Sequence, residues 1–241
     1  MSERYAKAPI TEAVIELRTE GPVPLAQLQK AEARIRKRYG KSEKLTEFKV
    51  TVGDPPQHSA SPAGFKLTSA DGSFIVQTRT GGLSVSSLAP YPGWRAFTAE
   101  LEEIWAIWTK AVGRRRLSRI GTRFLNRLDV PYGPDKRLES DDYLNVGVRL
   151  PPCTNNGADG GWQAVSVSLL PDTPFKLRLG CGTAAAAIIG HASFALDIDV
   201  FCDVDVPQTD ADIWALLAQA KTAKNLVFDE CITDKTRALI A

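Results

Sequence analysis

Hydrophobic and polar residues alternate with a period of two along several short stretches of the chain. Such alternation is typical of strands with one buried and one exposed face. In residues 10–18, for example, Ala13, Ile15 and Leu17 share one face with Thr11, whereas the other face carries two glutamates. The pattern predicts strands at 10–18, 45–52, 65–69, 74–79, 83–88, 116–130, 162–170, 175–181 and 193–206.

Turn residues separate these strands. Asp71-Gly72 and Gly81-Gly82 are strong signals for tight hairpins, so we expect residues 65–88 to form a meander. The stretch from Gly53 to Gly64 is rich in proline, serine and alanine, which predicts a mobile loop. A second loop, rich in glycine, asparagine and proline, is expected over residues 151–161.

A period of 3.6 residues predicts three long amphipathic helices. The first covers residues 24–39 and ends at Gly40, and the second covers residues 93–112. The third begins after Thr209 and Asp210, and shorter helical segments are expected at 139–146 and after Thr233. One narrow apolar stripe runs along the second helix, and its spacing indicates core packing rather than a ligand cage: Trp94, Phe97, Leu101, Ile104, Trp105, Trp108 and Val112. The core face of the last helix is expected to include Ile213, Leu216, Leu217, Ala220, Val227 and Cys231.

These elements predict an α+β protein with antiparallel sheets and long amphipathic helices packed on them. The order of elements is similar in residues 1–113 and 114–241, so we expect an N-terminal and a C-terminal α+β half within one compact unit. Each half follows a β-α-β(3-4)-α order, which favours an ancient duplication.

Composition narrows the function classes. The net charge of +2 among 241 residues is too small to imply nucleic-acid binding by the whole surface, so any basic surface must be local. The four cysteines are far apart, with no C-x-x-C, and there are two histidines, which argues against a zinc site and against a disulfide framework. Reduced, buried thiols and no cofactor are therefore expected. No stretch reaches transmembrane length and no signal-peptide pattern begins the chain, which predicts a cytoplasmic protein with no membrane partner.

Arginines are concentrated between residues 114 and 127. On a strand, Arg119, Arg123 and Arg127 share one face, and guanidinium groups in such a row can bind phosphate or carboxylate groups. We therefore take Arg119, Arg123, Asn126 and Arg127 as candidate ligand-binding residues, although Asn126 belongs to the opposite face of the strand. The alternative is a salt-bridge grid, in which the arginines pair with Glu12 and Glu16 or with the acidic strand from Asp197 to Asp205.

The sequence is also compatible with two alternative functions, metal-dependent catalysis and nucleic-acid binding. Asp197 and Asp199 stand two apart on a strand and could hold Mg²⁺ for nucleotide chemistry, although a D-x-D pattern is weak and no glycine-rich phosphate loop accompanies it. Nucleic-acid binding could use the basic face of helix 24–39 together with the arginine strand. No G-x-S-x-G motif is present, and His191 has no orienting carboxylate next to it in the sequence, so no catalytic residue is assigned.

Four segments form a specific set: Pro9-Ile-Thr-Glu-Ala-Val-Ile-Glu16, Ser69-Ala-Asp-Gly72, Leu88-Ala-Pro-Tyr-Pro-Gly-Trp94 and Arg119-Ile-Gly-Thr-Arg123-Phe-Leu-Asn126-Arg127. Together they resemble a sporadically distributed, functionally uncharacterised family of bacterial proteins of similar length, over nearly the whole chain. The resemblance implies no catalytic residues. The patchy distribution of that family implies an accessory gene, as in defence or toxin–antitoxin loci.

The sequence as a whole predicts a non-enzymatic cytoplasmic binding protein. Its partner is expected to be a protein or an anionic ligand, bound through the arginine-bearing sheet face. The alternatives are the Mg²⁺-dependent enzyme and the nucleic-acid-binding protein, and the sequence leaves the oligomeric state open.

Overall fold

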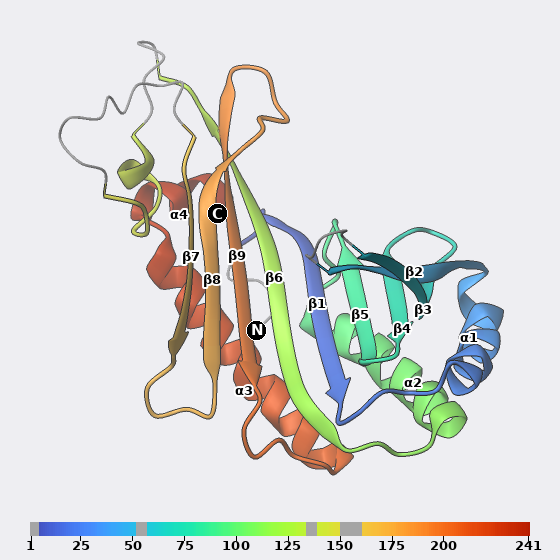
Figure 1. Cartoon of the computed structure of the whole chain (residues 1–241). Coiled ribbons are helices and arrows are strands. Elements are labelled where there is room, and N and C mark those ends of the chain that lie inside the picture. Colours follow the sequence, from blue (N-terminus) through green and yellow to red (C-terminus); the bar gives the residue numbers. More distant parts are fainter. Residues whose placement is uncertain (1–4, 52–56, 134–138, 150–160) are drawn as a thin grey trace. The chain divides into compact units, whose positions relative to one another are not determined.

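The computed structural model describes residues 5–51, 57–133, 139–149 and 161–241 (Figure 1). Over these residues nine strands form an antiparallel sheet in the order β2-β3-β4-β5-β1-β6-β9-β8-β7, so the expected α+β class is confirmed. The strands are β1 (Ile10–Thr19), β2 (Lys41–Thr51), β3 (Gln57–Thr68), β4 (Phe74–Arg79), β5 (Gly82–Leu88), β6 (Leu117–Pro131), β7 (Gln163–Leu169), β8 (Lys176–Ala184) and β9 (His191–Cys202). The helices are α1 (Leu25–Tyr39), α2 (Trp94–Val112), α3 (Asp210–Cys231) and α4 (Asp234–Ile240), with a 3₁₀ turn, η1, at Ser140–Asp142.

The loop predicted for Gly53 to Gly64 is wrong over its described part, because β3 begins at Gln57 and pairs with β2. The register shifts between Leu45 and Thr46, where Gly64 pairs with Leu45 and Pro62 pairs with Thr46. A β-bulge therefore lies beside Pro62. Bulges tolerate a residue that cannot donate to the ladder, which explains how a proline-containing segment forms a strand.

Two other expectations need correction. The acidic strand ends at Cys202, and Asp205 has a φ of 51°, so Asp203 and Asp205 do not extend its face. Residues 139–146 form only the short turn η1, followed by an isolated bridge from Leu144 to Ile232. The loop predicted for residues 151–161 lies almost wholly outside the described residues.

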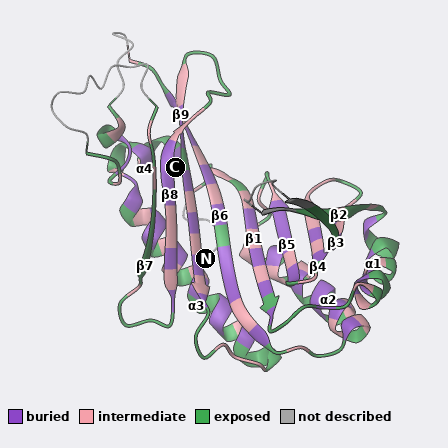
Figure 2. Ribbon diagram, in the orientation of Figure 1, coloured by how far each residue is buried: buried purple, intermediate pink, exposed green. Residues whose placement is uncertain are grey.

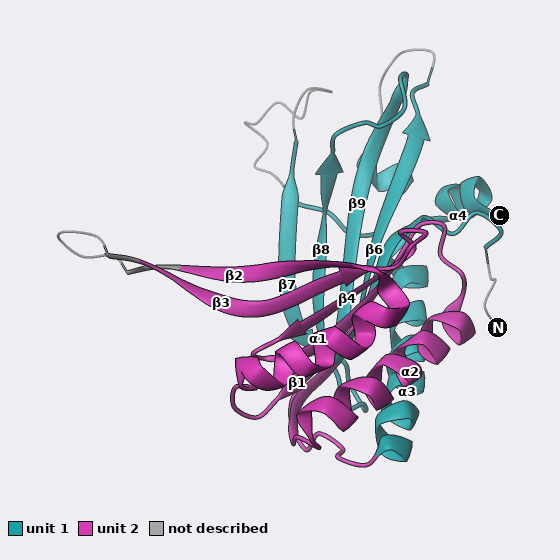
Figure 3. Cartoon of the chain, turned by 90° about the vertical axis from the view of Figure 1, so that its right-hand side faces the viewer, with its two compact units in different colours: residues 1–13, 121–202, 210–241 teal, residues 14–120, 203–209 magenta. Residues whose placement is uncertain are grey.

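The chain forms two compact units (Figure 3). The first comprises residues 1–13, 121–202 and 210–241, and the second comprises residues 14–120 and 203–209. Strands β1 and β6 thus contribute residues to both units. A duplication, and a division of the chain at residue 113, stay predictions.

In the second unit, α2 supplies the centre of the core. Six residues of its predicted apolar stripe are buried: Phe97, Leu101, Ile104, Trp105, Trp108 and Val112. Trp105 and Trp108 stack with ring centroids 5.4 Å apart, and the indole Nε1 of Trp108 donates to the Thr78 hydroxyl of β4 at 3.0 Å. The stripe is therefore core, as its spacing predicted.

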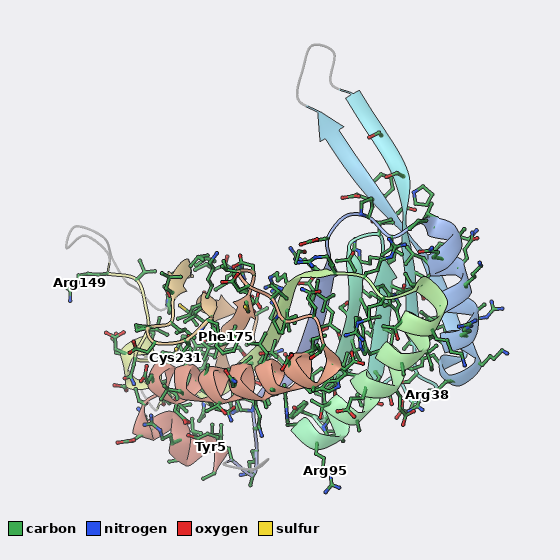
Figure 4. All side chains as sticks on the ribbon, turned by 90° about the horizontal axis from the view of Figure 1, so that it is seen from below. Tyr5, Arg38, Arg95, Arg149, Phe175 and Cys231 are labelled. Atoms are coloured by element: carbon green, nitrogen blue, oxygen red, sulfur yellow. The ribbon has the colours of Figure 1, made fainter. Side chains whose placement is uncertain are left out.

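Helix α1 packs beside α2 in the second unit and carries its basic residues outward. Arg38 of α1, labelled in Figure 4, forms ion pairs with Glu100 and Glu103 of α2. The Tyr39 hydroxyl donates to Glu100 at 2.8 Å, and burial raises the pKa of this tyrosine. These contacts join the two helices along their shared edge.

Gly82 starts β5 at a point where the backbone of β1 passes very close. Its φ is +137°, and a Cβ added there would lie 2.2 Å from the carbonyl oxygen of Leu17. We expect Gly82→Ala to lower the free energy of unfolding by about 2–4 kcal/mol, because strain and a backbone clash act together. Urea unfolding of the wild type and the variant measures this difference in the free energy of unfolding.

Gly81 is the matched control for that substitution. It precedes Gly82 in the same turn, and a Cβ there would meet nothing within 4 Å. Gly81→Ala should therefore change the stability by less than about 0.5 kcal/mol. Equal losses for the two alanine variants would contradict the proposed close approach.

In the first unit, α3 packs against β9 and covers one face of the sheet. Figure 2 shows many buried residues along β6, β9 and α3, whereas β7 is exposed along most of its length. The buried strand residues include Phe124, Leu128, Phe194, Leu196, Ile198 and Val200, and those of α3 include Ile213, Leu217, Ala220, Val227 and Phe228. The opposite face of these strands carries the arginines.

One charged residue lies within this helix–sheet core. Lys224 of α3 is 8% exposed, and its Nζ lies 4.0 Å from the ring centroid of Phe124 on β6. Burial, followed by repulsion from Lys221, lowers the pKa of Lys224 to about 8, and attraction by Asp229 opposes this. A lysine at a core position of this helix was not expected from the sequence.

Residues near both termini pack on the end of α3. The hydroxyl of Tyr5, labelled in Figure 4, donates to Asp229 at 2.8 Å, and its ring lies edge-on to Phe228. The amide of Lys7 donates to the carbonyl oxygen of Ile240 at 3.0 Å. The three described cysteines, Cys181, Cys202 and Cys231, are buried, and burial raises the pKa of Cys231 to about 12.

Candidate binding face

Arg123 lies on the face of the first unit's sheet that α3 does not cover. Its Nε and Nη2 donate to the two carboxylate oxygens of Asp197 on β9, each at 2.7 Å. Arg178 of β8 donates from Nη1 to the same carboxylate at 3.0 Å. Two guanidinium groups thus share one acid, in the bidentate geometry that Arg–carboxylate pairs favour.

The hydrogen bond with Asp197 raises the pKa of Arg123, with further contributions from Asp199 and Glu12. Arginine is already charged at every accessible pH, so the shift identifies the acids around it and does not indicate a switch. The Arg123 side chain remains 44% exposed, and that of Arg178 is 39% exposed. Both guanidinium groups can therefore contact another molecule while they hold Asp197.

Arg127 has partners of a different kind. Its Nε donates to Asp129, two residues along the same strand, at 2.9 Å. Its Nη2 donates to the Ala185 carbonyl and to the Ser193 hydroxyl, each at 3.1 Å, and Ser193 in turn donates to Asp129. This network ties the end of β6 to the start of β9.

The structure separates the remaining two candidates from this group. Arg119 belongs to the second unit, where it is largely buried and paired with Glu16. Asn126 is buried, and its amide donates to the carbonyl oxygens of Phe124 and Leu196 at 3.2 and 3.1 Å. Asn126 thus joins β6 to β9 by hydrogen bonds, and only Arg123 and Arg127 remain together on the first unit's face.

The alternative of a salt-bridge grid agrees with these contacts. Arg119 pairs with Glu16 and Arg123 pairs with Asp197, and both acids belong to the two groups named from the sequence. Sequence reasoning missed Arg178, which stands in register with Asp199. The alternating pattern of residues 175–181 was a signal for that strand, but it does not say which strand lies next to it.

The charges on the uncovered faces of β6, β8 and β9 nearly cancel. Four are positive, and three acids lie among them: Arg123, Arg127, Lys176 and Arg178 against Asp129, Asp197 and Asp199. Glu12 adds a fourth acid to the electrostatic surroundings of Arg123. This balance makes the face a mixed-charge surface with little excess positive potential.

An apolar row continues the same face onto β7. Val167 pairs with Arg178, which pairs with Asp199, so the three residues stand in one line across the strands. Val165, Val167 and Leu169 are 62%, 66% and 73% exposed. Sequence reasoning recognised this strand but not its exposure, because a Val-Ser-Val-Ser alternation is equally compatible with a buried apolar face.

The structure does not favour a metal site at Asp197 and Asp199. Both oxygens of Asp197 already accept from arginine, and nearby guanidinium charge repels a cation. Within the described parts of the chain, no three His, Cys, Asp or Glu side chains come together as metal ligands.

A pocket of about 340 Å³ lies in the second unit, where the β4–β5 turn meets the end of β1. Its charged lining residues are Glu16, Arg18, Glu47 and Arg79. Glu16 pairs with Arg18 at 2.9 Å as well as with Arg119, so its charge is balanced within the protein. The pocket therefore has charged groups of both signs and no single chemical preference.

The basic face of α1, the basis of the nucleic-acid alternative, is exposed at Lys30, Arg34 and Lys37. Arg38 is committed to two glutamates of α2. Solvated basic residues on an outer helix face are common on soluble proteins and do not by themselves form a binding site.

Comparison of the sequence with models of protein families found no match, and a search among curated proteins found no significantly similar sequence. Among the described residues, none of the helices combines the length and the apolar character needed to cross a membrane.

Proposed function

We propose that this chain is a non-enzymatic binding protein of the bacterial cytoplasm, and that the face around Arg123, Arg178 and Asp197 engages a protein partner. The observation that supports the proposal is the line from Arg178 to Val167, which joins half-exposed guanidinium groups to an exposed apolar row. Arginine beside exposed apolar side chains is typical of protein interfaces.

The charge balance favours a protein over a small anion. A site for phosphate needs positive charge that the protein leaves uncompensated, whereas Asp197 already accepts from both Arg123 and Arg178. A protein surface can instead match positive and negative groups together, with apolar contacts beside them. The family resemblance described above makes the product of an adjacent gene the first partner to test.

The experiment captures proteins from the source organism on the immobilised chain and identifies them by mass spectrometry. The test variant is Arg123→Gln/Arg178→Gln, in which the amide nitrogen at position 123 takes the place of the Nε that donates to Asp197. We expect it to lose the captured partner, and to bind the purified partner at least about tenfold more weakly, because interfacial arginines are frequent hot spots.

The control is Arg34→Gln/Lys37→Gln on α1, which removes the same number of exposed charges from the second unit. It should retain the partner. Equal capture by both variants would overturn the proposed face. Thermal stabilisation of the wild type by inorganic phosphate, lost in Arg123→Gln/Arg178→Gln, would instead assign the face to an anion.

A further inference from the structure

The outer edge of β7 has backbone groups that no described strand satisfies. Among the strands that the structure describes, β7 lies at the end of the sheet and pairs only with β8. The carbonyl oxygen of Trp162 accepts from Thr183, and the amide of Leu170 donates to Phe175, each at 3.0 Å. Because paired residues alternate in an antiparallel ladder, the even-numbered residues between them bond to β8. Gln163, Val165, Val167 and Leu169 therefore direct their N–H and C=O groups outward.

The same edge lacks the usual protection against pairing. Its seven residues, Gln-Ala-Val-Ser-Val-Ser-Leu, include no charge and no proline. The register with β8 is continuous from Gln163 to Leu169, without a bulge. Edge strands of monomeric proteins are commonly protected by lysine, proline or a bulge. Three of the four residues whose backbone faces outward, Val165, Val167 and Leu169, also have exposed apolar side chains.

We propose that the outer edge of β7 binds a second copy of this chain, by antiparallel pairing of β7 with β7 of the copy about a twofold axis at Ser166. This register places Val165 opposite Val167 of the copy and Gln163 opposite Leu169 of the copy. Each of these pairs joins two residues with outward backbone groups, so the ladder hydrogen bonds continue across the axis. The pairing uses the backbone edge of β7, whereas the proposed protein-binding face uses side chains, so the two proposals share the exposed apolar row of β7.

The strand's own symmetry identifies a second copy as the occupant. Around Ser166 the sequence reads valine on both sides and then two small residues, Ala164 and Ser168. Twofold pairing therefore sets β-branched residues against each other on one face and small residues on the other, as favourable cross-strand pairs require. The strand is uncharged, so no like charges oppose each other across the axis.

The interface is small, because it consists of one seven-residue strand from each copy. Stable specific interfaces bury at least about 1,200 Å², which one pair of short strands does not reach by itself. We therefore expect a dimer that dissociates on dilution, measurable by sedimentation velocity over a wide range of protein concentration.

Charge placement tests the pairing. Val165→Lys/Val167→Lys puts like charges opposite each other at both central pairs, and we expect it to remain monomeric where the wild type is dimeric. Val165→Lys/Val167→Glu puts opposite charges at the same pairs, so dimerisation should return. The control, Leu226→Lys/Ile189→Lys, replaces two exposed apolar residues of the first unit away from this edge and should dimerise like the wild type.

Hydrogen exchange provides a second measurement. In the dimer the amides of Val165 and Val167 should exchange more slowly than in the dilute monomer, whereas Ser166, which bonds to β8, should be unaffected. A wild type that is monomeric at every concentration would overturn the proposal, as would dimerisation of Val165→Lys/Val167→Lys at the wild-type affinity. Failure of Val165→Lys/Val167→Glu to dimerise would overturn the antiparallel register.

Discussion

Trp108→Ala is expected to lower the free energy of unfolding by about 4–6 kcal/mol. Trp108 is fully buried in the second unit and stacks on Trp105. Its removal leaves a large cavity between α2 and the sheet, which alone costs about 3–5 kcal/mol. It also removes the indole donor from the buried Thr78 hydroxyl. Urea unfolding followed by circular dichroism measures the loss.

Two milder substitutions separate the cavity from the hydrogen bond. Trp108→Phe keeps most of the ring and leaves Thr78 without its donor, so we expect a loss of about 1–3 kcal/mol. Adding Thr78→Val should recover part of that loss, because both polar partners are then removed. Arg95→Ala, on the exposed side of α2 (Figure 4), is the control and should change stability by less than about 0.5 kcal/mol. A loss below about 2 kcal/mol for Trp108→Ala would contradict a well-packed core at this position.

Periodicity predicted α2 and its buried face, because a helix with one stripe of large apolar residues buries them by packing that stripe against the core. The meander β4–β5 was equally predictable, since the residues of its turn allow few other conformations. The first part of strand β3, up to Gly64, was missed for a physical reason. Its Pro62 and Gly64 disfavour regular strands, and only the pairing with β2, through a bulge, makes the segment extended.

The arginine-bearing face was predictable in composition but not in geometry. Alternation correctly placed Arg123 on a face of β6, and the acidic strand offered Asp197 as its partner. Which strands are neighbours depends on long-range pairing that local patterns do not encode. The second guanidinium on Asp197, from Arg178, and the position of β7 at the edge both follow from that order.

Lys224 was absent from the expected core of α3, although the spacing of the buried residues points to it. Buried residues recur at 213, 217, 220, 224, 227 and 231, which is the helical period without a gap. Because lysine is polar, sequence analysis does not assign it to the buried face of a helix. Its long aliphatic chain can nevertheless pack in the core at this position. The charged amine of Lys224 is tolerated in the core because it lies against the face of the Phe124 ring.

Lys224→Met is expected to stabilise the protein by about 2 kcal/mol at neutral pH. Burial lowers the pKa of Lys224 to about 8, from 10.5 for the unperturbed side chain. This difference corresponds to a net cost of about 3 kcal/mol for holding the charge inside the fold, which is the upper limit of the gain in stability. Methionine has a similar length and can fill the site without a charge.

The stability difference between Lys224→Met and the wild type should depend on pH in a defined direction. Below about pH 8 the lysine is protonated in both the folded and the unfolded state, so the full cost is present. Between about pH 8 and 10.5 the unfolded chain binds a proton that the folded chain does not, so wild-type stability rises relative to the variant. Above that range the advantage of the variant disappears.

Urea unfolding of both proteins from neutral pH to about pH 11 measures this difference, and groups such as Cys231 that titrate in both proteins cancel. Lys221→Met, one turn earlier on α3, is the control. It removes a repelling charge, so it should slightly raise the pKa of Lys224 and change stability by less than about 0.5 kcal/mol. A Lys224→Met variant that is less stable than the wild type, or whose advantage is the same at every pH, would show that the amine reaches water or an acid. In that case the Lys224 amine would be stabilised by water or by an ion pair rather than by its contact with the Phe124 ring.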